Sequence, residues 1–246
     1  MSAPSSHLFI VTGSSRGLGA ALVERLLASP GNQVLGIARR TGPGHERLTQ
    51  WSLDLAQPLA AAQQLQAWLA QQARPASATL INNAALLNPP GPVEGVELAA
   101  LSDGLRVGLE ATLLLSSAFL RAARPWGVPL KILNISSGLG RRAMAGAAPY
   151  CAAKAGMDNL SASMALDEAQ RADGARVVSL APGIIDTDMQ VQLRAADPAG
   201  FPDHGNFVGY KSSGALASPV ATAAKILAYL ARSDFGHQAI ADIRQA

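Results

Sequence analysis

Cysteine, aromatic residues and charged residues are all scarce in this chain of 246 residues, and each scarcity excludes a class of protein. Cys151 is the only cysteine, so neither an internal disulfide nor a cysteine-ligated metal cluster can form. The four histidines lie far apart, without the spacing that metal ligands show. We therefore expect no metal site.

The small net charge argues against a nucleic-acid partner. Charged residues make up 15% of the chain and aromatic residues 4%, and the formal net charge is +3. A nucleic-acid-binding protein usually concentrates Lys and Arg in one stripe or patch, with aromatic side chains where it binds single strands. The basic residues of this chain are scattered instead.

Long apolar runs are also absent. No run is long enough to span a bilayer, so no membrane partner is expected. The first residues, 1–13, lack the basic stretch and apolar run of a secretion signal. These two features predict a cytoplasmic protein.

The apolar residues, 49% of the chain, are grouped in short runs that alternate with helical patterns. The continuous apolar character of the first run is typical of a parallel strand that is covered on both faces. Alternating strand and helix signals predict βαβ units in a single α/β domain over residues 1–246, with a doubly wound parallel sheet and helices on both faces. The predicted strands are 7–12, 34–38, 79–82, 131–135 and 176–180, and the clearest predicted helices are 18–29, 98–122 and 152–172.

Residues 188–217 depart from this pattern. They contain two prolines and four glycines and have poor periodicity. A long irregular segment in a compact domain is usually a lid or a binding loop. We expect an irregular loop here that covers the substrate.

A glycine-rich sequence, TGSSRGLG, connects the first strand to the first helix. Gly13, Gly17 and Gly19 permit a tight turn and let backbone amides approach a pyrophosphate at the helix N-terminus. The alternative is an ordinary glycine-rich turn. The position between a strand and an amphipathic helix favours a Rossmann-type dinucleotide site.

Arginines at the end of the second strand indicate which dinucleotide binds. NAD enzymes usually place Asp or Glu there for the ribose hydroxyls, whereas this chain has Arg39 and Arg40, with Arg16 in the glycine loop. The planar donors of arginine match a phosphate. The pattern predicts NADP(H), with Arg40 interpreted as a solvated residue.

Tyr150 and Lys154 are four residues apart at the start of a predicted helix, and Ser137 lies just after a strand. Such a set suits alcohol and carbonyl chemistry, in which serine orients the oxygen, tyrosine transfers the proton and lysine lowers the pKa of the tyrosine. One cation about 4 Å away, at an effective dielectric of about 20, is worth roughly 4 kcal/mol, or at most about three pKa units before desolvation. Alone, the Tyr–Lys pair also fits an ordinary helix surface.

The order of these motifs resembles the short-chain dehydrogenase/reductase family over nearly the whole chain. The matching segments are TGSSRGLG, Asp54-Leu55, residues 82–85 (NNAA), Ile135-Ser136-Ser137, Tyr150-x-x-x-Lys154 and Pro182-Gly183. The resemblance implies that Ser137, Tyr150 and Lys154 are catalytic, and it implies a cofactor site of Gly13, Ser15, Arg16, Gly17, Leu18, Gly19, Arg39, Asp54, Leu55, Asn83, Ala84, Tyr150, Lys154, Pro182, Gly183, Ile185 and Thr187. Asp54 would meet the adenine, Asn82 the ribose side, and 182–187 the nicotinamide carboxamide.

Within the family, residues 181–190, 207–216 and 241–243 resemble the sepiapterin reductase and benzil reductase branch. That resemblance implies a substrate contact for Asp242; a surface or dimer-contact residue is the alternative. It also implies a homodimer or homotetramer.

Two departures from the family pattern stand out. Ala85 replaces a usual glycine, and Gly108 replaces an asparagine that supports a proton-relay water; we expect a packing reason for Gly108. Cys151 is interpreted as a packing residue. Arg141 and Arg142 fit solvated loop residues, with an acidic substrate as the alternative.

The sequence thus predicts an NADPH-dependent carbonyl reductase for a ketone or 1,2-diketone. Two alternatives remain: a non-catalytic NADP(H)-binding sensor on the same fold, and an NAD-linked alcohol dehydrogenase.

Overall fold

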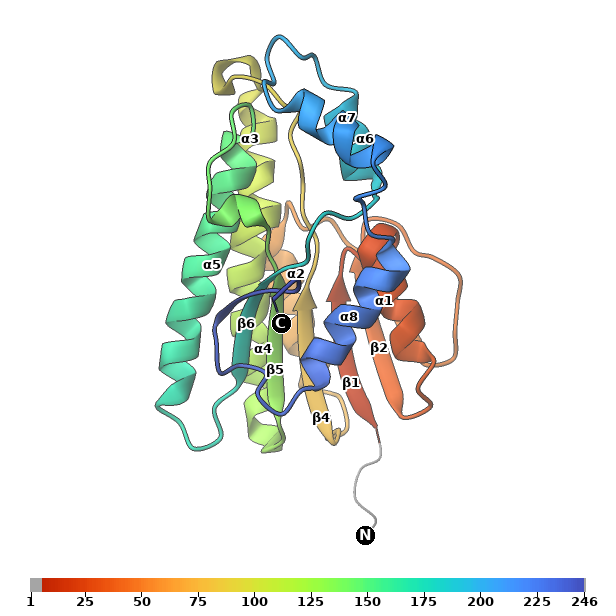
Figure 1. Cartoon of the computed structure of the whole chain (residues 1–246). Helices are drawn as coiled ribbons and strands as arrows, with labels where there is room; N and C mark the ends of the chain where they lie inside the picture. Colours follow the sequence, from red (N-terminus) through yellow and green to blue (C-terminus); the bar gives the residue numbers. More distant parts are fainter. Residues whose placement is uncertain (1–5, 246) are drawn as a thin grey trace.

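The computed structural model describes residues 6–245, and its centre is a seven-stranded sheet in which every strand pairs in parallel (Figure 1). The strand order is β3-β2-β1-β4-β5-β6-β7. The strands are β1 (His7–Thr12), β2 (Asn32–Ala38), β3 (Leu48–Ser52), β4 (Ser77–Asn82), β5 (Leu130–Ile135), β6 (Arg176–Ala181) and β7 (Ile240–Asp242). The predicted doubly wound parallel sheet is confirmed.

The five strands predicted from apolar runs all form, whereas two edge strands were missed. β3 is nowhere fully buried, and β7 has only three residues, so neither carries a continuous apolar run. Edge strands are covered on fewer sides than central strands, which removes the signal that revealed the others.

Helices cover both faces of the sheet (Figure 1). One layer is formed by α1 (Gly17–Leu27) and α8 (Pro219–Ala231), and the other by α2 (Pro58–Leu69), α4 (Ala111–Ala123) and α5 (Ala148–Ala169). In α1, Leu18, Leu22 and Leu26 are buried at the spacing of one helical face. Each layer closes its own hydrophobic core against the sheet.

The predicted helix 98–122 is divided in two. It consists of α3 (Leu98–Leu105) and α4, joined by a π-helical turn at Arg106–Glu110. A π-helical turn inserts a residue into the regular helix and is often found at functional sites. This turn contains Gly108.

The prediction of an irregular loop at residues 188–217 was wrong. The segment forms α6 (Asp188–Arg194) and α7 (His204–Ser212), which lie beyond the end of the sheet (Figure 1). Phe201 and Phe207 stack with their ring centroids 5.5 Å apart and bury themselves against Leu87 and Met144. Tertiary packing therefore imposes helical structure despite the weak local signal.

The order in which strands are added reverses at β1: β2 and β3 lie on one side of it, and β4 to β7 lie on the other. In an open α/β sheet this switch point is where ligands bind, outside the carboxyl ends of the strands. Among the described helices, none combines the length and apolar character needed to cross a bilayer.

Candidate active site

The glycine-rich loop after β1 has the geometry of a phosphate cradle. Gly13 and Gly17 have positive φ angles of 66° and 55°, a region that favours glycine. A Cβ on Gly19 would lie 2.0 Å from the carbonyl oxygen of Gly13, so the loop and the first turn of α1 touch directly. No side chain in the described part of the chain caps the N-terminus of α1. Its amides are thus available to an anion.

Thr12 and Asn83 hold this loop in place. The hydroxyl of Thr12 accepts hydrogen bonds from the amides of Asn83 at 2.9 Å and Ala84 at 3.0 Å. The Asn83 side chain donates back to the carbonyl oxygens of Thr12 at 3.0 Å and Gly13 at 3.3 Å. The loops after β1 and β4 are therefore clamped together at the switch point. Thr12 was missed as a site residue, although its position directly before the glycine loop could have indicated it.

The residues predicted for the cofactor's phosphate and adenine end lie at the same edge of the sheet. Arg39 and Arg40 are exposed directly after β2. Asp54 is exposed, and its carboxylate accepts a hydrogen bond from the Ala56 amide at 3.0 Å. Leu55 is buried beneath it. This arrangement leaves two guanidinium groups and one carboxylate free to face solvent.

Arg16 already has a partner. Its Nη1 lies 2.6 Å from Oδ2 of Asp188, at the start of α6, and both side chains are about 70% exposed (70% and 71%). An exposed ion pair contributes about 0–1 kcal/mol. The pair would therefore oppose only weakly the transfer of Arg16 to a phosphate.

The loop after β6 closes the site from the other side. A Cβ on Gly17 would lie 3.4 Å from Cγ2 of Thr187. Ile185 forms a bridge with Ala217, and Gly183 has a φ of 82°. The predicted carboxamide segment, 182–187, is thus adjacent to the glycine loop. Together these features fit a nicotinamide dinucleotide.

Tyr150 and Lys154 share one face of α5, and the structure brings Ser137 to them. The Nζ atom of Lys154 lies 5.7 Å from the centroid of the Tyr150 ring. The same Nζ donates to the carbonyl oxygen of Ile135 at 2.7 Å, which ties α5 to the end of β5. Ser137 follows two residues later and begins a 3-10 turn, its hydroxyl accepting from the Leu139 amide at 3.2 Å.

Burial controls the protonation of both titratable groups. It raises the pKa of Tyr150 to about 12, against the opposing effect of a hydrogen bond with the Ser137 hydroxyl. Burial lowers the pKa of Lys154 to about 8, against the opposing effect of the Asp158 carboxylate. Lys154 is not among the groups that shift the pKa of Tyr150 in the protein without cofactor, and desolvation has the largest effect there. At neutral pH Tyr150 keeps its proton and Lys154 is mostly charged.

Close packing explains why residue 108 is a glycine, as expected from the sequence. A Cβ at Gly108 would lie 2.9 Å from the Cβ of Ala153 on α5, closer than real Cβ contacts come. The glycine therefore allows the π-helical turn to approach α5 directly behind Lys154. An asparagine at this position would require the π-helical turn or α5 to shift.

We expect Gly108→Asn to lower the free energy of unfolding by about 1–3 kcal/mol, as overpacking does. Urea denaturation followed by circular dichroism measures this change. Gly209→Asn is the matched control, because Gly209 is a helical glycine with open space around it. Equal stability of the Gly108 variant and the parent would contradict the packing explanation.

Three polar residues have partners that the sequence did not indicate. Asn82, expected on the ribose side, is buried and donates to Asn134 at 2.8 Å and Ser116 at 3.2 Å, so its role in the structure is in the core. Asp242 forms a bidentate pair with Arg244, at 2.9 and 2.6 Å.

The guanidinium of Arg141 has partners within the fold, although part of its side chain is exposed. It binds Asp158 at 3.2 Å and the carbonyl oxygen of Ala241 at 2.9 Å, whereas Arg142 is exposed as expected. Cys151 packs in the apolar cluster beneath α6 and α7. Among residues 6–245, no group of three or more His, Cys, Asp or Glu side chains could hold a metal ion.

A doubly wound parallel sheet with a glycine cradle at its switch point is typical of dinucleotide-binding α/β proteins. Residues 7–198 match the family model described as short chain dehydrogenase. The chain belongs to the short-chain dehydrogenase/reductase family, whose members bind a nicotinamide cofactor and act on CH–OH and C=O groups.

Similar proteins cover nearly the whole chain. Benzil reductase ((S)-benzoin forming) from Bacillus cereus is 30% identical over 236 residues, which span 92% of this chain and 94% of that protein. Sepiapterin reductase from Mus musculus is 34% identical over 247 residues, spanning 92% of each chain. The structure of a short-chain dehydrogenase from Streptomyces avermitilis superposes with a TM-score of 0.77 at 27% identity, covering 98% of this chain and 89% of that one. The branch indicated by the sequence is thus confirmed.

Proposed function

We propose that this protein is an NADPH-dependent carbonyl reductase in which Ser137, Tyr150 and Lys154 act on a ketone or 1,2-diketone. The observation that carries the proposal is the buried ammonium of Lys154 beside the Tyr150 ring, at 5.7 Å from its centroid. A tyrosine that stays protonated at neutral pH is suited to donate a proton.

The proposed reaction assigns one task to each side chain. The nicotinamide, when bound, supplies the hydride that adds to the carbonyl carbon. The phenolic oxygen of Tyr150 gives its proton to the carbonyl oxygen, so that the C=O double bond becomes an alcohol. The hydroxyl of Ser137 orients the carbonyl oxygen by a hydrogen bond. Lys154 stabilises the phenolate that the proton leaves behind.

An aromatic or otherwise apolar ketone fits the surroundings of Tyr150. Tyr150 and Cys151 border the apolar cluster that includes Met144, Phe201 and Phe207. The relatives are named for benzil, which is aromatic, and for sepiapterin. The test is NADPH oxidation, followed by the loss of its absorbance, with benzil, aliphatic 1,2-diketones and sepiapterin. NADPH binding without turnover of any carbonyl would instead support the non-catalytic sensor.

We propose that Asp242 contacts the substrate only after it leaves Arg244. The carboxylate is bound on both oxygens by Arg244, whose side chain is 67% exposed and can move away. The alternative, a purely structural pair at the end of β7, predicts no change in substrate KM on removing the carboxylate.

We also propose a homodimer or homotetramer formed through the long helices. The support is the exposed apolar side chains of Leu113 on α4 and Leu166 on α5.

The proposed preference for NADP(H) depends on Arg39. Hydrogen bonds to charged groups contribute about 1.5–3 kcal/mol, which corresponds to roughly ten- to hundredfold in affinity. We expect Arg39→Asp to weaken NADPH binding by about this factor, because a carboxylate also repels the 2′-phosphate. NADH binding should stay the same or become tighter, because the new carboxylate can bind the ribose hydroxyls. Protein fluorescence titration with both cofactors measures the effect.

Arg40→Asp is the matched control for this variant. Arg40 is the neighbouring exposed arginine and is interpreted as solvated, so its replacement should weaken NADPH binding less than that of Arg39. A parent protein that binds NADH more tightly than NADPH would support the NAD-linked alcohol dehydrogenase instead.

A further inference from the structure

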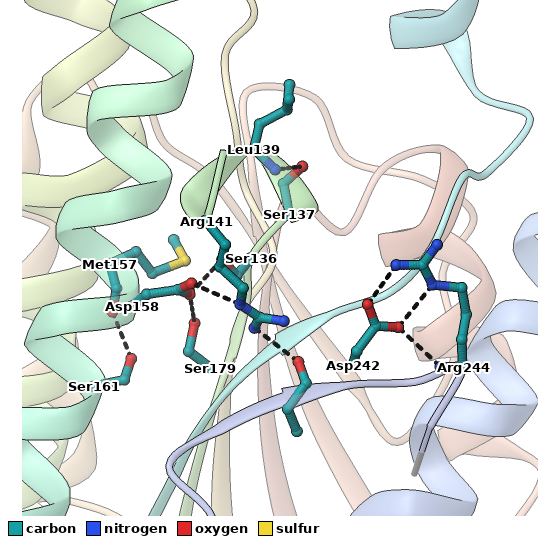
Figure 2. Close-up of polar contacts among 11 residues, drawn as sticks. Ser136, Ser137, Leu139, Arg141, Met157, Asp158, Ser161, Ser179, Asp242 and Arg244 are labelled. Carbon is teal, nitrogen blue, oxygen red and sulfur yellow. Dashed lines mark hydrogen bonds and ion pairs between the residues drawn. The ribbon is translucent and has the colours of Figure 1, made fainter. Parts of the chain in front are cut away.

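Asp158 lies one helical turn after Lys154 on α5, and its buried carboxylate joins three other segments (Figure 2). Oδ1 accepts hydrogen bonds from the hydroxyl of Ser136 at 2.5 Å and of Ser179 at 2.6 Å. Oδ2 accepts from Nε of Arg141 at 3.2 Å. The carboxylate thus connects α5 to the end of β5, to β6 and to the loop after the candidate catalytic serine.

The segment around Ser137 is fixed on both sides by this carboxylate. Ser136 precedes Ser137, and Arg141 follows it after one 3-10 turn. Between them, a Cβ on Gly140 would lie 2.9 Å from the carbonyl oxygen of Lys154 and 3.0 Å from Oδ2 of Asp158, so the turn packs directly on α5. The position of Ser137 relative to Tyr150 and Lys154 is therefore set by contacts to Asp158.

A largely buried carboxylate paired with a partly exposed arginine is a costly way to hold a fold together. Well-packed apolar residues often stabilise such a position equally well or better. The carboxylate does, however, supply something that apolar residues cannot, which is negative charge beside a buried ammonium. This points to a role in the chemistry of the site in addition to packing.

We infer that Asp158 is a positioning residue for the proposed reaction, which holds the Ser137 turn against α5 and places a negative charge one helical turn from Lys154. This inference rests on the proposed function of Ser137, Tyr150 and Lys154. Arg141 completes the arrangement by donating to the carbonyl oxygen of Ala241, which links the same carboxylate to β7 (Figure 2).

The charges around Lys154 define the expected electrostatic effect. The groups that face it are Asp158 and Tyr150 on α5 and the carbonyl oxygen of Ile135 on β5. The groups that face Asp158 are Arg141 and the two serine hydroxyls, and Arg141 in turn acts on Asp242. Asp158 raises the pKa of Lys154, against the larger lowering by burial. Loss of this negative charge would therefore lower the pKa of Lys154 further.

Asp158→Asn tests the negative charge of this side chain separately from its hydrogen bonds. The amide oxygen can still accept from Ser136 and Ser179, while the negative charge and the ion pair with Arg141 are lost. The alkaline limb of the pH profile of kcat/KM reports the loss of the proton from Lys154. We expect this limb to move to lower pH by about one unit, the usual scale for one nearby opposite charge. The variant should therefore approach the parent at pH 6 and fall about tenfold below it at pH 9.

Two further variants are expected to leave the position of the alkaline limb unchanged. Ser136→Ala keeps the charge and removes one anchor, so kcat should fall at all pH values without movement of the limb. Glu168→Gln is the matched control, because Glu168 is also a buried carboxylate of α5, paired with Arg124 at 2.6 Å but near the other end of the helix. It should change thermal stability and leave the pH profile unchanged.

Arg141→Gln keeps the test decisive if Asp158→Asn does not fold. It removes a positive charge and leaves the carboxylate, so the alkaline limb should stay or move to higher pH. Movement to lower pH in this variant, or coincident profiles of Asp158→Asn and the parent, would overturn the inference. Full activity of Tyr150→Phe would instead overturn the proposed function, and the two failures are thus distinguishable.

Discussion

Tyr150→Phe is expected to lower kcat for ketone reduction by about 10²–10⁴-fold, the range that positioned proton donors contribute. Phenylalanine keeps the ring that lies beside Lys154 and loses only the oxygen that carries the proton. Because the substrate oxygen must then be protonated by water, the hydride acceptor loses its main stabilisation. The apolar contacts of the ring in the cluster beneath α6 and α7 are retained.

The measurement combines steady-state kinetics with cofactor titration. NADPH affinity should change by less than about threefold, since no charge is removed. Tyr229→Phe is the control, because Tyr229 is a second tyrosine with buried surface but lies on α8, where it packs on Phe235. A Tyr150→Phe enzyme with parental kcat would mean that proton transfer does not pass through this phenol.

Local patterns revealed the centre of the fold but not its edges. β1 and β4–β6 are covered on both faces, so their sequences are rich in apolar residues and predict strands directly. β3 and β7 lie at the two edges of the sheet, and nothing in their residues requires a strand. α6 and α7 form because Phe201 and Phe207 bury against residues more than fifty positions away, including Met144. That contact cannot be read from local periodicity.

The candidate site also combines local motifs, which the sequence reveals, with contacts between distant segments, which it does not reveal. The glycine loop and the Tyr–Lys pair are local motifs, and the parallel sheet brings them to one edge because all strands end there. The network around Asp158 could not be predicted, since Ser136, Ser179 and Arg141 come from three segments and meet only in the folded chain. The pKa of Tyr150 depends on how far the ring is desolvated, which charge spacing in the sequence does not reveal.

Gly19→Ala is expected to weaken binding of the nicotinamide cofactor by at least about 100-fold and to destabilise the protein by about 1–3 kcal/mol. In an ordinary helix the same change would stabilise by about 1 kcal/mol, because alanine has the higher helix propensity. Here the added Cβ would lie 2.0 Å from the carbonyl oxygen of Gly13 and 2.7 Å from Nδ2 of Asn83. Both are parts of the clamp that joins the loops after β1 and β4.

Gly19→Ala should lower the stability of this protein, whereas Gly→Ala in an ordinary helix raises stability, so the substitution tests the contact directly. Relief of the clash requires the Gly13 peptide to move, which also moves the uncapped amides of α1 that would face the pyrophosphate. Gly205→Ala is the matched control, because Gly205 is also in the first turn of a helix and has open space around it. It should leave NADPH affinity unchanged and raise the melting temperature slightly. If Gly19→Ala behaved in the same way, the contact between the glycine loop and α1 would not hold the cofactor site in shape.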